Sequence, residues 1–152
     1  MKTKMDYYDD AAKKADELIR TYNLTLDVRS DLLSVFKAMG IPVGIDPHVE
    51  FNFFTPDGAV KIPGKSFLDS PCNRVEVVYK WAARWLPKNI VPAWSYGIQM
   101  SFAYEFLMPH KEVRAYLKER PQASVEDVAM YFNVSKLFAA ERLDKYEEEV
   151  SV

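Results

Sequence analysis

A chain of 152 residues with 49% hydrophobic and 28% charged side chains has the composition of one folded globular domain, which excludes wholesale disorder. Lys and Arg number 20 against 22 Asp and Glu, and the resulting net charge of −2 argues against strong non-specific binding to nucleic acid. The single cysteine, Cys72, excludes an intramolecular disulfide framework and a multi-cysteine zinc or iron–sulfur site. The N-terminus runs into acidic residues, unlike a signal peptide, and the nearly uncharged run at residues 90–104 is too short to span a bilayer. We therefore expect a cytoplasmic protein without a membrane segment.

Hydrophobic spacing predicts two helices at the start of the chain. An apolar stripe at helical spacing indicates a helix over residues 6–22, with Tyr22 as the last buried position. A second stripe predicts one continuous helix over residues 28–39. Gly40 follows it, at the position where a left-handed C-cap is favoured.

The region that follows is the only one with β-like character. Runs at residues 49–54 and 59–62 flank the sequence Thr-Pro-Asp-Gly at residues 55–58, which is typical of a tight turn. This pattern predicts a hairpin, with residues 41–45 as a candidate third strand. About three short antiparallel strands would need a helix to cover one face.

The remaining sequence predicts further helices and a solvated tail. Ser70 and Pro71 are typical of a helix start, and the buried stripe of that helix is expected to include Trp85. Ser124 and Asp127 resemble a capping box. The expected helices span residues 70–86, 94–107, 111–119, 124–132 and 136–146, and the one at 94–107 is apolar nearly all round and hence central. We predict an α+β fold, mainly helical, as a single domain over residues 1–146 with a frayed acidic tail at 147–152.

A few reactive side chains are candidates for chemistry, but none has strong support. His48 and His110 could bind zinc together with an acid, although nothing in their spacing favours this. Cys72 lies near a helix start, which lowers a thiol pKa, but no histidine partner is positioned for it. An acidic cluster suits a helix start better than a metal site, and it consists of Asp6, Asp9 and Asp10.

The last two helices have the lengths of a helix-turn-helix. The second helix offers Lys136, Arg142 and Lys145 to a phosphate backbone. It also carries acidic residues, which repel phosphate, and these are Glu141 and Asp144. Packing against the core is the favoured interpretation, and DNA binding through residues 124–146 remains an alternative.

Motifs in the C-terminal half carry a resemblance to a known family. They read F-A at residues 102–103, E-F-L-M-P at 105–109, S-V-E-D-V-A-M-Y-F-N-V-S at 124–135 and A-A-E-R-L at 139–143. This pattern resembles the ImmA/IrrE family, whose members read F-A-x-x-L-L-M-P and then S-V-E-x-L-A-x-x-F-x-V-S-x-x-A-x-x-R-L. The resemblance covers roughly residues 8–146. It implies a zinc metallopeptidase-like fold of the kind encoded by phages, mobile elements and bacterial stress loci.

The same resemblance implies that the catalytic residues have been replaced. The family's catalytic helix, R-F-x-x-A-H-E-L-G-H, corresponds to R-V-E-V-V-Y-K-W-A-A at residues 74–83. The two zinc histidines then fall on Tyr79 and Ala83, the general-base glutamate on Lys80, and the third ligand near Tyr96. Alanine has no ligand atom, a neutral phenol is a poor ligand and a lysine ammonium repels Zn²⁺.

Two interpretations of these positions stay open. In the first, the substituted side chains only fill space, with Trp81 and Trp85 covering the former cleft. In the second, Lys80 and the nearby aromatic side chains line a groove that binds a peptide without cutting it. We expect a catalytically inactive protein without metal or cofactor that binds a repressor, a toxin or a host regulatory protein. The alternatives are a peptidase with relocated ligands from His48 and His110, and a DNA-binding regulator.

Overall fold

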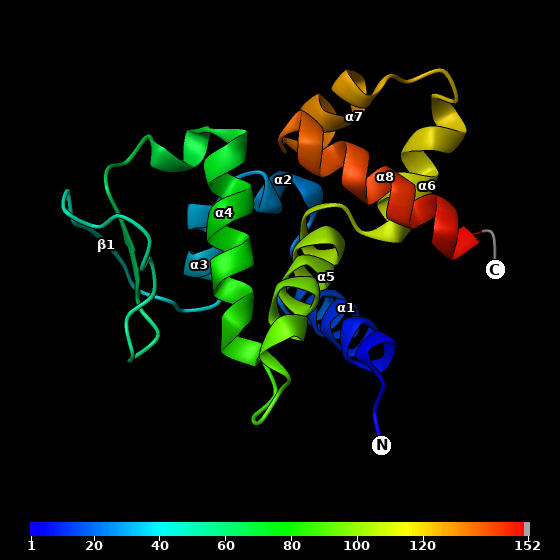
Figure 1. Ribbon diagram of the computed structural model, residues 1–152. Helices are drawn as coiled ribbons and strands as arrows, with labels where there is room; N and C mark the ends of the chain where they lie inside the picture. Colours follow the sequence, from blue (N-terminus) through cyan, green and yellow to red (C-terminus); the bar gives the residue numbers. More distant parts are fainter. Residues whose placement is uncertain (151–152) are drawn as a thin grey trace.

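The computed structural model describes residues 1–150 and is mainly helical, as the sequence predicts. Two short strands lie at one end of the molecule and α6–α8 at the other, with α1, α4 and α5 between them (Figure 1). The elements are α1 (Lys4–Thr21), α2 (Leu26–Arg29), α3 (Leu32–Ala38), β1 (Val43–Ile45), β2 (Val60–Ile62), η1 (Phe67–Asp69), α4 (Pro71–Ala82), η2 (Ala83–Trp85), η3 (Pro92–Trp94), α5 (Ser95–Leu107), α6 (His110–Glu119), α7 (Val125–Phe132) and α8 (Lys136–Val150). Within residues 1–150, no helix is both long enough and apolar enough to cross a membrane.

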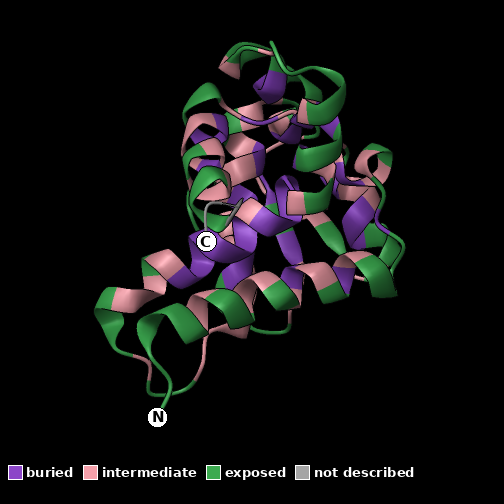
Figure 2. Cartoon of the chain, turned by 90° about the vertical axis from the view of Figure 1, so that its right-hand side faces the viewer, coloured by how far each residue is buried: buried purple, intermediate pink, exposed green. Residues whose placement is uncertain are grey.

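The core is built around α5, which is buried nearly all round, as its uniform apolar character predicts. Trp81 of α4 meets Phe102 and Phe106 of α5 edge to face, with ring centroids 5.7 and 5.3 Å apart. Phe36 of α3 packs on the same indole at 5.5 Å. Buried residues therefore concentrate where these helices meet, while the outer face of α1 is exposed (Figure 2).

A glycine allows α1 and α5 to approach each other closely. A Cβ atom at Gly97 would lie 2.0 Å from the hydroxyl oxygen of Tyr8, far inside van der Waals contact. The contact therefore requires a residue without a side chain at Gly97. This approach fixes the start of α5 against the first turns of α1.

Two predictions for the first 40 residues are wrong in detail. The helix expected over residues 28–39 is broken into α2 and α3, because Asp31 adopts an extended backbone and its carboxylate accepts from the amide of Leu33 as an N-cap. Tyr22 is exposed rather than buried, because α1 ends at Thr21 and Tyr22 is its C-cap residue. Gly40 has a φ of +71°, as expected of a left-handed C-cap.

The sheet differs from the prediction of about three antiparallel strands. It has two parallel strands, β1 and β2, and the expected hairpin is reduced to one antiparallel bridge between Phe54 and Val60. The amide of Val60 donates to the carbonyl of Pro42 on one side, and that of Lys61 donates to Phe53 on the other. The chain reverses direction twice between β1 and β2, so β2 is inserted between β1 and residues 53–54 and runs parallel to β1. The predicted turn is present, and Gly58 has a φ of +88°.

The later helices lie where predicted, with three differences. Ser70 precedes α4 but makes no side-chain capping hydrogen bond. Trp85 is only half-buried, because the buried face of α4 is centred on Trp81 and the last turn tightens into η2. Residues 147–150, expected to fray, continue α8, although Glu147–Glu149 are exposed to solvent. Residues 151 and 152 of the predicted tail lie outside the described residues.

Candidate functional site

The C-terminal end of α4 carries three of the four residues expected at the former active site. Tyr79 and Lys80 lie in its last turn, and Ala83 begins η2 directly after it. Tyr96 is the second residue of α5, which packs against α4. All four positions therefore lie near the C-terminal end of α4.

Tyr79 and Tyr96 form a pair on one side of this helix end. Their ring centroids are 5.7 Å apart, and the side-chain amide of Gln99 donates to the carbonyl oxygen of Tyr79 at 2.9 Å. Burial, followed by the neighbouring Tyr96 and Glu76, raises the pKa of Tyr79 above that of an ordinary tyrosine. Near neutral pH the Tyr79 side chain is therefore an uncharged phenol.

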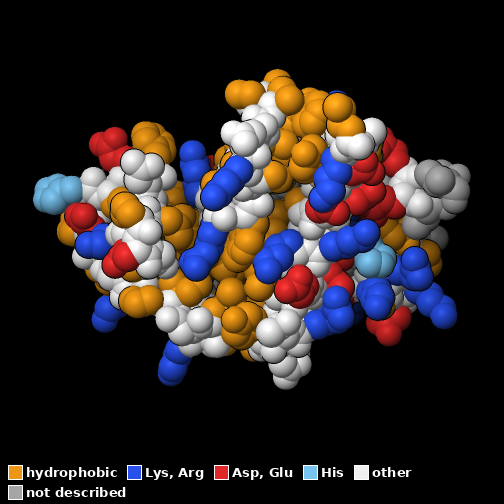
Figure 3. Space-filling model, turned by 90° about the horizontal axis from the view of Figure 1, so that it is seen from below, with side chains coloured by type: hydrophobic (Ala, Val, Ile, Leu, Met, Phe, Trp, Pro, Cys, Tyr) orange, Lys and Arg blue, Asp and Glu red, His pale blue; other side chains and the backbone are white. Residues whose placement is uncertain are grey.

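Lys80 and Ala83 line a cleft of about 450 Å³, and neither Tyr79 nor Tyr96 is part of its lining. The opposite wall of the cleft is the tight turn at residues 55–58. Phe54 contributes partly exposed apolar surface, while Trp81 borders the cleft but is almost fully buried. Arg84 lines the same cleft, so two cationic side chains face the turn. Figure 3 views the end of the molecule where α4 ends and shows Lys and Arg side chains around a band of hydrophobic ones.

The cations of the cleft are only weakly engaged within the protein. Lys80 Nζ lies 3.9 Å from Glu76 Oε1, and both side chains are more than one-third exposed, so this ion pair contributes little to stability. A Cβ atom at Gly58 would lie 3.1 Å from Arg84 Nη1, which shows that the guanidinium lies directly against the turn. Asp57 also lines the cleft, and the hydroxyl of Thr55 lowers the pKa of its carboxyl group.

These side chains do not fit the zinc ion that the family resemblance implies. A catalytic zinc needs three protein ligands and a base for the metal-bound water. This helix end instead offers a neutral phenol at Tyr79, an ammonium at Lys80 and a methyl group at Ala83, while Tyr96 is a second phenol, 61% exposed. Within residues 1–150, no group of three or more His, Cys, Asp or Glu side chains is arranged to hold a metal ion.

The two histidines lie on separate parts of the fold. His48 is exposed in the loop after β1, where its amide donates to Asp46 Oδ1. His110 is the first residue of α6, and its Nδ1 lies 2.9 Å from Glu105 Oε1. The β1 and α6 elements lie at opposite ends of the molecule (Figure 1), so the structure does not bring the two imidazoles together.

The other single-residue candidates have local roles. Cys72 is exposed in the first turn of α4. Asp6 forms a capping box with Thr3 at the start of α1, and Asp10 pairs with Lys2 at 2.6 Å. The acidic cluster is therefore a feature of the helix start.

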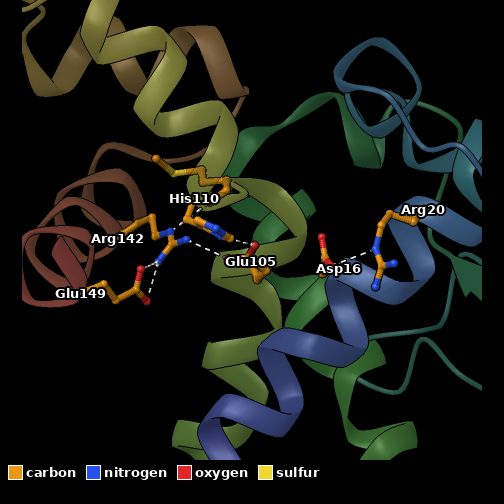
Figure 4. Close-up of polar contacts among 7 residues, drawn as sticks. Asp16, Arg20, Glu105, His110, Arg142 and Glu149 are labelled. Carbon is orange, nitrogen blue, oxygen red and sulfur yellow. Dashed lines mark hydrogen bonds and ion pairs between the residues drawn. The ribbon is translucent and has the colours of Figure 1, made fainter. Parts of the chain in front are cut away.

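A buried ion-pair network links α5, α6 and α8, and no local sequence pattern indicated it (Figure 4). Arg142 is 1% exposed, and its Nη2 lies 3.0 Å from Glu105 Oε2 while its Nε donates to the carbonyl of Met108. Its Nη1 lies 3.3 Å from Glu149 Oε1. Because Glu105 also contacts His110, this carboxylate joins three helices. Glu105 and Arg142 both belong to the motifs that carry the family resemblance, so those motifs have a structural role here.

A second buried network joins α2, α4, α6 and the turn after α7. Arg29 lies 2.6 Å from Glu112 Oε1, and Arg74 donates to the backbone carbonyls of Arg29 and Asn133. Burial, followed by the charge of Arg29, lowers the pKa of Arg74 to about 10. These long-range contacts could not be predicted from local sequence patterns.

The cations of the terminal helix pair are mostly engaged within the protein. Arg142 is buried in the network just described, and Lys145 Nζ donates to Ser101 Oγ and lies over the rings of Tyr8 and Tyr104. Lys136 pairs with Glu126 at 2.6 Å on the surface. The capping box of Ser124 and Asp127 forms as predicted.

Comparison with known proteins finds one similarity, in the C-terminal part of the chain. The family model Peptidase_M78, described as the IrrE N-terminal-like domain, matches residues 88–144, which cover η3, α5–α7 and most of α8. The match begins after α4, so it includes Tyr96 but not Tyr79, Lys80 or Ala83. No curated protein and no solved structure shows a significant match to the chain. Residues 88–144 are therefore similar to the IrrE N-terminal-like (Peptidase_M78) domain, which agrees with the resemblance to the ImmA/IrrE family.

Proposed function

We propose that this chain is a catalytically inactive ImmA/IrrE-like protein that acts in the cytoplasm by binding another protein. The observation that carries the proposal is the chemistry at the end of α4. The resemblance assigns two ligands and the base to Tyr79, Ala83 and Lys80, which offer a phenol, a methyl group and an ammonium instead. Replacing any one of them would not restore a metal site, because at least two imidazoles and a carboxylate are needed.

The cleft beside these positions is the proposed binding surface. Lys80 and Arg84 supply positive charge beside the partly exposed apolar side chain of Phe54. A segment that combines carboxylates with an apolar or aromatic side chain would complement this arrangement. We propose that the partner protein containing this segment is a repressor, a toxin or a host regulatory protein, because the family occurs in phages, mobile elements and bacterial stress loci.

The experiment compares capture of a partner by two charge-reversed variants in the native host. Lys80→Glu with Arg84→Glu reverses the charge of the two basic side chains in the cleft. Arg114→Glu with Lys118→Glu makes the same charge change on two exposed side chains of α6. Cross-linking and mass spectrometry of the tagged proteins measure the partner retained. We expect the cleft variant to retain at least tenfold less partner than the wild-type chain, and the control variant to retain the same amount.

Equal loss from both charge-reversed variants would show that binding depends on overall charge, and no loss from either would show that the cleft is not the binding surface. Two further results would redirect the proposal. Stoichiometric zinc lost on mutating His48 or His110 would favour a peptidase with relocated ligands. Duplex binding at micromolar concentration that weakens with salt and on Lys136→Ala would favour a DNA-binding regulator.

A further inference from the structure

The strand β1 forms an open edge of the sheet. It pairs with β2 on one side, and within residues 1–150 the sheet has no further strand beyond it. The carbonyl of Pro42 and the amide of Asp46 point toward β2, where they bond to Val60 and Ile62. Backbone groups alternate sides along a strand, so those of Val43 and Ile45 point to the open edge.

The same two residues present apolar side chains to solvent. The Val43 residue is 38% exposed and the Ile45 residue is 49% exposed, although both have large apolar side chains. They line a groove of about 470 Å³ together with Leu33, Ile41 and Ile62. Aliphatic surface therefore lies beside two pairs of outward-facing backbone groups.

The groove has positive charge and no acidic residue in its lining. Lys37 of α3 and Lys65, which follows β2, complete its walls. Neither lysine forms an ion pair with another of the described residues. The groove therefore complements a ligand that is apolar in its middle and anionic at its ends.

We propose that the β1 edge binds a short extended segment of a partner protein by strand addition. The segment is about four residues long, alternates apolar and polar side chains and is flanked by Asp or Glu. Its backbone would bond to Val43 and Ile45, its apolar side chains would fill the groove, and its carboxylates would meet Lys37 and Lys65. An acyl chain with a carboxylate would match the groove but not the outward-facing backbone groups, which is why we assign a peptide. This site is separate from the cleft at Lys80, and the proposal does not depend on the one made for that cleft.

The test uses a fluorescein-labelled peptide, Glu-Glu-Val-Thr-Val-Thr-Glu-Glu, with fluorescence anisotropy as the readout. We expect saturable binding to the full chain below 1 mM, and at least a tenfold weaker Kd when the four central amides are N-methylated. Lys37→Glu with Lys65→Glu should weaken binding of the acidic peptide at least tenfold. The same double substitution should strengthen binding of a peptide with Lys in place of each Glu. The control variant is Leu137→Lys, an exposed apolar side chain on α8, and it should change neither affinity.

Amide hydrogen exchange separates strand addition from other modes of binding. The amides of Val43 and Ile45 should exchange at least tenfold more slowly when the peptide is bound. No saturation by 1 mM peptide would overturn the proposal. Equal affinity for the N-methylated peptide, with unchanged exchange at these two amides, would also overturn it, because the groove would then recognise only an anionic apolar chain.

Discussion

The buried network around Arg142 allows a comparison in which one cation meets two carboxylates that differ in burial. Glu105 is 8% exposed and lies 3.0 Å from Arg142 Nη2, whereas Glu149 is 42% exposed and lies 3.3 Å from Nη1. Glu105→Gln removes the buried charge with almost no change of volume, and Glu149→Gln does the same at the surface. We predict that the first substitution is much more destabilising than the second.

The expected magnitudes follow from what each substitution leaves behind. Removing one partner of a buried pair costs about 3–5 kcal/mol because the other charge remains buried. Glu105→Gln should lower the free energy of unfolding by about 3 kcal/mol, since Glu149 still lies 3.3 Å from the guanidinium. An exposed pair contributes about 0–1 kcal/mol, which sets the expectation for Glu149→Gln.

Urea denaturation followed by far-ultraviolet circular dichroism measures both values. With a slope of about 2 kcal/mol per molar urea, the midpoint should fall by about 1.5 M for Glu105→Gln and by less than about 0.5 M for Glu149→Gln. Equal effects of the two substitutions, or a loss below about 1 kcal/mol for Glu105→Gln, would refute the reasoning. Glu105 would then not act as the buried counter-charge that joins α5, α6 and α8.

Three other predictions follow from packing and ionisation. Trp81→Ala should lower the free energy of unfolding by about 3–5 kcal/mol and Trp85→Ala by clearly less, because only Trp81 is fully buried; equal losses would contradict this. Gly97→Ala should lower the melting temperature, because the new Cβ meets the Tyr8 ring. In a Tyr8→Ala background the same substitution should lower the melting temperature much less. An unchanged melting temperature on Gly97→Ala alone would contradict the close approach. Burial and the hydrogen bond to a glutamate raise the pKa of Tyr104, so the native state holds this proton more tightly than the unfolded state. The contribution of the protonated Tyr104 to the free energy of unfolding is therefore complete below pH about 10 and is lost as the pH rises further. Tyr104→Phe should make the fall of this free energy at alkaline pH less steep, as measured by urea titration.

Local signals predicted most of the helical fold. The apolar run at residues 94–107 predicted a central helix, and Gly40 and the Ser124 capping box marked helix ends through bonds to residues a few positions away. The break between α2 and α3 also has a local cause, the N-cap at Asp31, but the continuous apolar stripe obscured it. The choice of Trp81 over Trp85 as the buried indole depends on α3 and α5, which no periodicity within α4 can reveal.

Long-range relations could not be predicted in the same way. β1 and β2 run parallel because β2 is inserted between β1 and residues 53–54. Neither the alternation of apolar and polar residues nor the turn residues predicts this order of strands. The site was predicted in part. The resemblance placed Tyr96 near Tyr79, and the structure brings these rings together, but nothing local indicated that the turn at residues 55–58 would face Lys80 across a cleft.

The metal content and peptidase activity of the purified chain test the central proposal most directly. Elemental analysis of untagged protein, loaded with excess zinc and dialysed, should give well below one zinc per chain, and no candidate repressor should be cleaved. The positive control carries Tyr79→His, Lys80→Glu, Ala83→His and Tyr96→Glu, which place two imidazoles one helical turn apart, a base and a third ligand, and it should gain zinc. About one tightly bound zinc in the wild-type chain, with a chelator-sensitive peptidase activity that Lys80→Ala leaves unchanged, would contradict the account.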